Sequence, residues 1–171
     1  AFLGKPLPVP DATSYRPVIA LFTMTALLSV ATSWLSFGRV FTVQTIEWFI
    51  SFSMVVLALL KLQDVEKFST MFLNYDLLAK KWVPYGRIYP YAEGLAGLLM
   101  AAEFAHVISI PVALFIGIVG SISVFKAVYV DKRELKCACV GGSSNVPLGF
   151  ISLTENLMMV AMAVWMFFTM N

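Results

Sequence analysis

The chain has 171 residues, of which 60% are hydrophobic and 13% are charged, and its mean hydropathy is +0.84. A water-soluble domain needs a polar exterior that this composition does not supply, so we expect an integral membrane protein. The formal net charge is only +2, and no basic patch is interleaved with aromatic residues, so nucleic acid is not an expected partner. The sequence contains neither a phosphate-binding glycine loop nor a Ser-His-Asp set, and it does not support a hydrolase or a nucleotide enzyme.

The first 17 residues form a proline-rich lead that contains Lys5, Asp11 and Arg16. The first apolar run follows this lead and is long enough to span a membrane, which is not the pattern of a cleaved signal peptide. We interpret residues 1–17 as a linker from a preceding soluble domain and residues 18–171 as one membrane domain.

Apolar residues gather in five runs, at 18–37, 41–62, 88–104, 107–130 and 148–170. A helix needs about 20 such residues to cross the hydrocarbon core. The runs lack two-residue alternation, which excludes a barrel, and other open backbone would leave polar groups unpaired in lipid. The run 88–104 is the shortest and carries Glu93 and Glu103, but its small residues suit close helix packing. The sequence therefore predicts an all-α integral membrane protein with a five-span helical bundle.

The connection 63–87 between the second and third spans is too long for a tight turn. Its apolar residues recur at helical spacing beside charged ones: Val65, Phe68, Met71, Phe72, Tyr75 and Leu78. This pattern predicts an amphipathic helix that lies on the membrane interface and ends at Pro84, with Trp82 and Tyr85 anchored at headgroup depth.

Basic residues are distributed unevenly among the loops of this five-span scheme. Of the 12 lysine and arginine residues, all but Arg39 fall in the N-terminal lead, the connection after the second span or the connection after the fourth. The positive-inside rule then places the N-terminus and both long connections in the cytoplasm and the C-terminus outside. The bilayer itself is one expected partner.

Two cysteines, Cys137 and Cys139, lie one residue apart in the connection before the last span, and they are the chain's only cysteines. The cytosol keeps thiols reduced, so a structural disulfide is not expected there. Two neighbouring thiolates can form a strained, readily exchanged disulfide, or they can bind a soft metal ion such as Cu(I) or Hg(II). Zinc is disfavoured because the segment offers only two of the four ligands that a tetrahedral site needs.

Glu93 and Glu155 fall near the cytoplasmic ends of their predicted helices, on the same side as the cysteines. An ionised carboxyl at that depth is costly, so it is usually protonated, paired or turned toward a cavity. We expect its partner among Lys61, Arg87 and Lys126, with Asn156 and either Tyr89 or Tyr91 completing a polar lining. These carboxyls either fix the helix register or accept a proton from a thiol.

Three stretches resemble the MauE/DoxX family of redox-associated membrane proteins: Lys61-Leu62-Gln63-Asp64 with Phe68, Tyr89-Pro90-Tyr91-Ala92-Glu93-Gly94, and Cys137-Ala138-Cys139. They lie at successive helix ends within residues 41–170, and the run 18–37 lies outside the family's four-helix core. The lead Phe2-Leu3-Gly4-Lys5-Pro6 to Tyr15-Arg16-Pro17 resembles the junction of members that carry a glutaredoxin domain in front. The resemblance implies help with disulfide formation or maturation of a partner protein, in the inner membrane of a bacterium.

Two hypotheses follow for the function. In the first, Cys137 and Cys139 form a thiol-disulfide relay that exchanges with a glutaredoxin-like domain or a small thiol such as glutathione, with Glu93 and Glu155 as catalytic proton acceptors. In the second, the same cysteines bind a soft metal ion or metal-thiol complex that crosses the bundle. No residue marks a quinone site, no other cofactor is indicated, and the sequence leaves the oligomeric state open, a homo-oligomer included.

Overall fold

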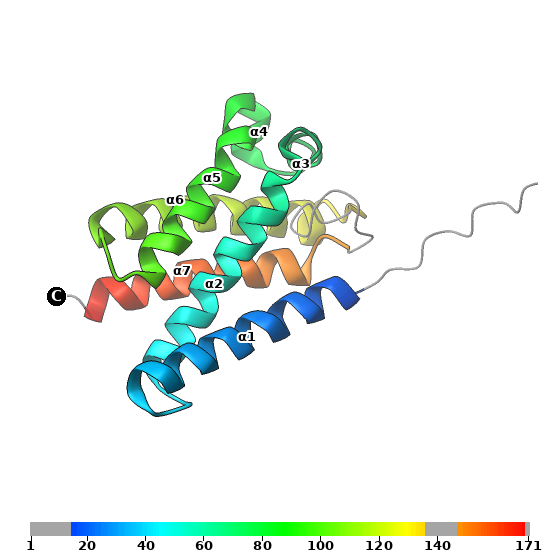
Figure 1. The fold of residues 1–171 in the computed structure, drawn as a ribbon. Coiled ribbons are helices and arrows are strands. Elements are labelled where there is room, and N and C mark those ends of the chain that lie inside the picture. Colours follow the sequence, from blue (N-terminus) through cyan, green and yellow to red (C-terminus); the bar gives the residue numbers. More distant parts are fainter. Residues whose placement is uncertain (1–14, 136–146, 170–171) are drawn as a thin grey trace, which may run out of the picture.

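The computed structural model describes residues 15–135 and 147–169, and within these ranges every regular element is a helix (Figure 1). This confirms the predicted all-α class. The elements are α1 (Arg16–Phe37), α2 (Val43–Leu62), α3 (Val65–Phe72), α4 (Leu77–Lys81), α5 (Val83–Ala101), α6 (His106–Phe125), the π-helical turn η1 (Lys126–Val130) and α7 (Phe150–Thr169).

Four helices in the described part of the chain are long and apolar enough to cross a membrane: α1, α2, α6 continued through η1, and α7. Their ends lie within two residues of the predicted runs 18–37, 41–62, 107–130 and 148–170. The predicted third run, 88–104, overlaps α5, which begins earlier, at Val83, and ends earlier, at Ala101. This helix is not among the four, because Arg87, Glu93 and several tyrosines make it more polar than the others.

The long helices form two pairs, with α2 packed along α5 and α6 packed along α7 (Figure 1). Helix α5 also contacts α6, and α1 packs on α2 at the edge of the bundle. Glycine permits the closest approach of α2 and α5, since a Cβ at Gly97 would lie 2.9 Å from Met54 Cβ and 3.0 Å from the Ser51 carbonyl oxygen. Close backbone contact of this kind is how membrane helices associate without a hydrophobic driving force.

The connection between α2 and α5 differs from the single interfacial helix that the sequence predicts. It forms two short helices, α3 and α4, because Asp64 and Asp76 each start a new helix by accepting hydrogen bonds from backbone N–H groups. Pro84 does not end a helix there but lies in the first turn of α5, where its missing N–H leaves no hydrogen bond unmade. Trp82 is exposed as expected, whereas Tyr85 is buried and is not a headgroup anchor.

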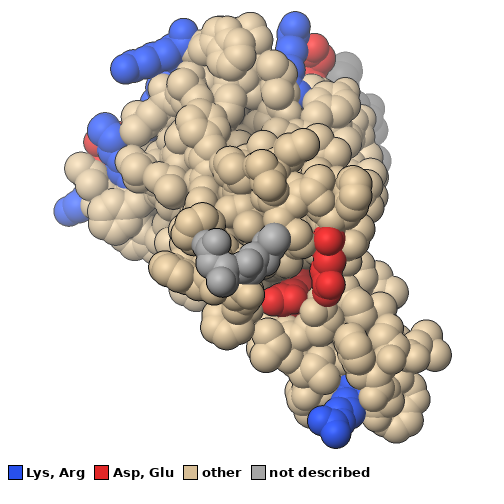
Figure 2. Space-filling model, turned by 90° about the vertical axis from the view of Figure 1, so that its left-hand side faces the viewer, with Lys and Arg blue, Asp and Glu red and all other residues tan. Residues whose placement is uncertain are grey.

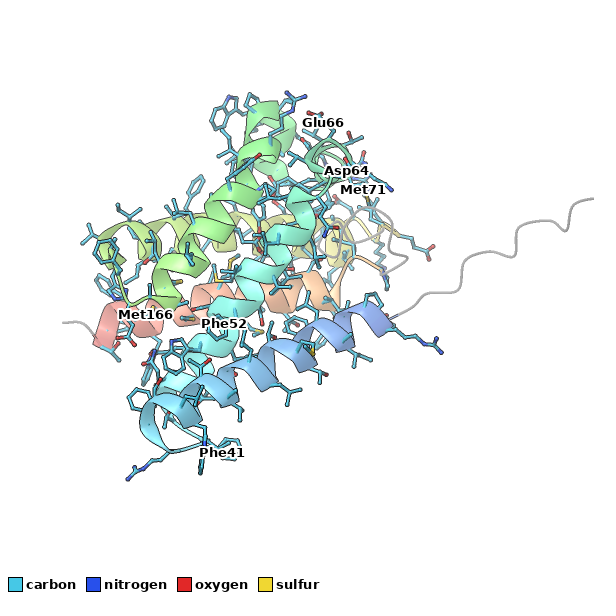
Figure 3. All side chains as sticks on the ribbon, in the orientation of Figure 1. Phe41, Phe52, Asp64, Glu66, Met71 and Met166 are labelled. Atoms are coloured by element: carbon cyan, nitrogen blue, oxygen red, sulfur yellow. The ribbon has the colours of Figure 1, made fainter. Side chains whose placement is uncertain are left out.

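The two ends of the bundle differ in charge. We call the end formed by α3, α4, the start of α5, η1 and the start of α7 the charged end, since it carries eight basic residues: Lys61, Lys67, Lys80, Lys81, Arg87, Lys126, Lys132 and Arg133. In Figure 3, Asp64, Glu66 and Met71 lie at this end, and Phe41 and Met166 lie toward the other. Figure 2 views the molecule from the left-hand side of Figure 1 and shows a largely uncharged surface, with basic side chains along its upper and left-hand margins and at its lower end, and acidic side chains near its centre.

Candidate functional site

Three ionisable side chains from three helices meet inside the bundle near the charged end. Lys61 Nζ of α2 donates hydrogen bonds to both carboxyl oxygens of Glu93 in α5, at 2.8 and 2.7 Å, and to Oε1 of Glu155 in α7, at 2.7 Å. The side chains of Lys61, Glu93 and Glu155 are only 2%, 0% and 4% exposed. We call this cluster the ion triad.

Each member of the ion triad is placed by an otherwise apolar helix. Lys61 lies in the last turn of α2, where the helix dipole favours a cation. Glu155 lies in the second turn of α7, and Glu93 lies midway along α5. Buried charges are tolerated only when they are paired and hydrogen-bonded, so the three side chains depend on one another for their burial.

The ion triad contains two carboxyl groups but only one ammonium group. Lys61 Nζ can balance only one negative charge, so two ionised carboxyls would leave a buried negative charge without compensation. Within the described part of the chain, Glu155 Oε2 has no hydrogen-bond partner. One proton on either carboxyl would therefore balance the charge of the cluster.

A small cavity of about 10 Å³ adjoins the ion triad, which is close to the least volume that holds one water molecule. Tyr89 Oη donates a hydrogen bond to Asn156 Oδ1 at 3.4 Å, and Asn156 Nδ2 donates to the Ser152 carbonyl at 2.7 Å. Gly120 leaves room for this amide, since a Cβ at position 120 would displace the Asn156 side chain. The cavity lining is Lys61, Phe68, Phe72, Tyr75, Tyr89, Gly120, Val124, Ser152, Glu155 and Asn156.

Aromatic rings from α3 and α5 lie close to the lysine of the ion triad. Lys61 Nζ lies 5.9 Å from the ring centre of Phe68 and 5.2 Å from that of Tyr89. A cation at this range is attracted to the face of an aromatic ring. The amphipathic pattern of the 63–87 connection therefore reflects burial of Phe68 and Phe72 over the ion triad rather than contact with lipid.

Only one of the three possible partners named from the sequence contacts Glu93 and Glu155. Lys61 binds both, as expected, whereas Arg87 pairs with Glu66 at 3.0 Å and Lys126 pairs with Asp131 at 2.8 Å. Of the three possible partners, Lys61 is the one that pairs with the carboxyls.

Of the residues predicted to form a polar lining, some line the cavity and one does not. Asn156 lines the cavity, and of the two tyrosines Tyr89 does so, whereas Tyr91 is 60% exposed. The sequence suggested Lys61 only as one partner among three, and its position at the end of an apolar run does not distinguish it from Lys126.

Cys137 and Cys139 lie outside the described residues, but the chain on both sides of them is fixed. Leu148 N donates a hydrogen bond to Leu135 O at 2.7 Å, and Arg133 Nη1 donates to Asn74 O at 2.6 Å. Glu155 lies five residues after Phe150, the first residue of α7. Five residues correspond to a rise of about 7.5 Å along the axis of an α-helix. Leu135 and Leu148, described residues that flank the cysteines, therefore lie at the end of the bundle that holds the ion triad.

Acidic side chains also lie toward the other end, where Glu47 Oε1 accepts a hydrogen bond from Trp165 Nε1 at 2.9 Å. Among residues 15–135 and 147–169, no group of three or more His, Cys, Asp or Glu side chains is arranged to hold a metal ion.

The fold and the ion triad define a polytopic helical membrane protein with a buried charge cluster. The family model for methylamine utilisation protein MauE matches residues 38–169, so the chain belongs to the MauE family. The match runs from the turn before α2 through α7 and leaves α1 outside it, as the resemblance implied. Comparison with curated proteins and with solved structures gave no match.

Proposed function

We propose that this MauE-family protein is a membrane thiol-disulfide relay in which Cys137 and Cys139 alternate between dithiol and disulfide. The observation that carries the proposal is the ion triad, a buried cluster of two carboxyls and one ammonium group at the end of the bundle where the described residues that flank the cysteines lie. The partner in exchange is a glutaredoxin-like domain or a small thiol such as glutathione. A redox or maturation role is also what membership of the family suggests.

The proposed topology has five spans, with α5 as the third, in the inner membrane of a bacterium. The antiparallel packing of α5 against α2 and its contact with α6 support a crossing helix despite its polar residues. The positive-inside rule then places the charged end and the N-terminus in the cytoplasm and the C-terminus outside. A preceding soluble domain, joined through residues 1–17, would lie on the cysteine side.

In the exchange reaction, one thiolate of the pair attacks a disulfide of the partner and breaks its S–S bond. The second thiol of the pair then attacks the mixed disulfide, which closes the Cys137–Cys139 disulfide and releases the partner as a dithiol. The pair loses two electrons and two protons, and the partner gains both. Glu155 takes a proton from the attacking thiol and returns it to the departing sulfur, while Lys61 and Glu93 hold Glu155 in place.

The carrier hypothesis is less well supported by the same geometry. A cation that crossed the bundle past Glu93 and Glu155 would need the position of Lys61 Nζ, which lies 2.7 Å from an oxygen of each carboxyl. A second positive charge there would be repelled by the ammonium group. Soft-metal binding by the cysteines alone remains a separate outcome of the test.

The test uses the full chain in vesicles, as wild type and as Cys137→Ser and Cys139→Ser variants. Each protein is equilibrated with glutathione buffers of graded redox ratio, and its free thiols are counted by maleimide mass shift. The wild type should lose both thiols together in a two-electron transition, and neither variant should form an internal disulfide. Ser144→Ala, in the same segment, is the control and should behave as wild type.

Wild-type rates of exchange in both cysteine variants would refute the relay. The metal-carrier hypothesis would replace the relay hypothesis if the wild type shows no thiol exchange but takes up Cu(I) with a defined stoichiometry, and if both cysteine variants lose that uptake.

A further inference from the structure

A groove separate from the ion triad runs between α4 and α6. It has a volume of about 360 Å³, and its walls are Leu77, Leu78, Lys81, Phe115, Val119 and Ile122. Five of these six side chains are apolar, and the sixth is a lysine. This is the composition expected where a molecule with a hydrocarbon tail and an anionic group meets a protein.

The wall from α6 lies in a membrane-spanning helix. Phe115, Val119 and Ile122 follow one another at spacings of four and three residues, so they share a helix face. Phe115 and Ile122 are 54% and 55% exposed, and no described helix covers them. This face is therefore open to lipid along about two turns of α6.

The wall from α4 is held firmly in place. Leu77 N donates a hydrogen bond to Ser123 Oγ of α6 at 3.0 Å. Asp76 Oδ1 accepts hydrogen bonds from Leu78 N and Ala79 N at 2.9 and 2.8 Å. One bond joins α4 to α6, and the other two cap the N-terminus of α4. The position of α4 relative to α6, and with it the groove, therefore does not depend on a bound molecule.

The rim of the groove is positively charged. Lys81 is exposed and forms no ion pair with any residue in the described ranges, and α4 itself contains two lysines and no acidic residue. Trp82 follows and is 53% exposed, which is typical of a residue at the membrane–water boundary. Basic side chains also line the upper margin of the molecule in Figure 2, at the height of α4 in Figure 1.

We infer that this groove binds an anionic phospholipid. One acyl chain lies between α4 and α6 along Phe115, Val119 and Ile122, and the phosphate of the headgroup accepts hydrogen bonds from Lys81 Nζ. A soluble anion would make no use of the apolar walls, and a zwitterionic lipid would gain less from the uncompensated lysine. The bound lipid braces α4 against α6. The inference does not depend on the proposed thiol chemistry.

The test measures retention of phosphatidylglycerol and of phosphatidylcholine by the purified full chain, using native mass spectrometry. The wild type should retain phosphatidylglycerol preferentially. Lys81→Gln should lower its affinity about fivefold, the change that corresponds to the ~1 kcal/mol of one lysine near an anionic headgroup. Lys80→Gln is the matched control, because Lys80 is exposed on the same helix but does not line the groove.

A second pair of variants tests the apolar walls. Val119→Trp fills the groove and should abolish preferential retention, whereas Val164→Trp, on the exposed face of α7, should leave it unchanged. If Val119→Trp fails to fold, Ile122→Trp at a half-exposed position replaces it. Three results would each overturn the inference. The affinity for phosphatidylglycerol could fall equally in Lys81→Gln and Lys80→Gln, the groove-filling tryptophan variants could retain this lipid fully, or the wild type could retain the two lipids equally.

Discussion

Lys61 joins two carboxyl groups that lie 32 and 94 residues further along the chain. Its side chain is 2% exposed, so its charge has almost no contact with solvent. Removing one partner of a buried charge cluster leaves the others uncompensated, and the cost is larger than the net value of the cluster itself. The ion triad is therefore a point at which single substitutions have large effects.

Lys61→Met should lower the free energy of unfolding by about 3–5 kcal/mol, because it leaves two carboxyl groups buried without a cation. Denaturant titration in mixed micelles measures the change. Lys126→Met is the control, since Lys126 is 49% exposed and its pair with Asp131 should contribute less than about 1 kcal/mol. The double variant Lys61→Met with Glu93→Gln should recover part of the loss. Equal stability of Lys61→Met and wild type would show that the cluster is not held together by charge.

Glu155→Gln should slow thiol exchange at neutral pH by about 100-fold, the lower range for loss of a general acid-base group. The defect should shrink as the pH rises toward the usual thiol pKa of about 8.5, because the thiolate then forms without a base. Exchange rates against pH, measured by maleimide quenching, check both statements. A purely structural role for Glu155 predicts a defect that does not change with pH, and Glu103→Gln at the other end of the bundle should have no effect.

Among the helices, α4 depends most on a single side chain. It has five residues, too few for a stable helix by itself, and Asp76 caps it through two backbone hydrogen bonds. Burial raises the pKa of Asp76 above its ordinary value, although the bonds from Ala79 and Leu78 oppose the shift. The folded state thus holds a proton on Asp76 more tightly than the unfolded state does.

Asp76→Ala should cost about 1–2 kcal/mol of stability, whereas Asp76→Asn keeps an acceptor for the cap and should cost far less. Because the pKa of Asp76 is raised on folding, the stability of wild type relative to Asp76→Asn should fall as the pH rises above about 3.9, the unfolded value. Denaturant titrations between acidic and neutral pH test this. A wild type that instead gains stability over Asp76→Asn with rising pH would mean that the carboxylate is favoured by the fold.

The four candidate spans α1, α2, α6 with η1, and α7 were predictable from sequence to within two residues because the thickness of the bilayer sets the length of an apolar run. The ends of α5 were not, since this helix begins at Val83 and ends at Ala101 instead of covering the predicted run 88–104. The structure of the connection between α2 and α5 was not predictable from the amphipathic pattern alone. Asp64 and Asp76 each cap a new helix there, so two short helices form instead of one. Glu93 and Glu155 could be identified because a carboxyl in an apolar run is conspicuous. Their shared contact with Lys61 could not, because it depends on how three distant helices pack.

At the scale of the whole molecule, the proposed arrangement depends on α5 as a crossing helix. An odd number of spans puts the two termini on opposite sides of the membrane, and it also puts the cysteine segment on the same side as α3 and α4. If α5 did not cross, its first and last residues would face the same compartment. The polar residues of α5 do not prevent a crossing, since Glu93 is fully buried against Lys61 and Arg87 lies near the end of the helix.

Single cysteines introduced into a Cys137→Ser, Cys139→Ser background test this arrangement with an impermeant maleimide on intact cells. Ala102→Cys, at the end of α5, and Arg39→Cys, in the turn before α2, should be labelled from outside. Lys80→Cys in α4 and Lys132→Cys after η1 should be labelled only after the membrane is permeabilised, because the positive-inside rule predicts that the basic charged end faces the cytoplasm. Labelling of Ala102→Cys only after permeabilisation, together with Lys80→Cys, would show that α5 does not cross. Labelling of Lys132→Cys on intact cells would move the cysteine segment outside, where a glutaredoxin-like cytoplasmic partner could not reach it.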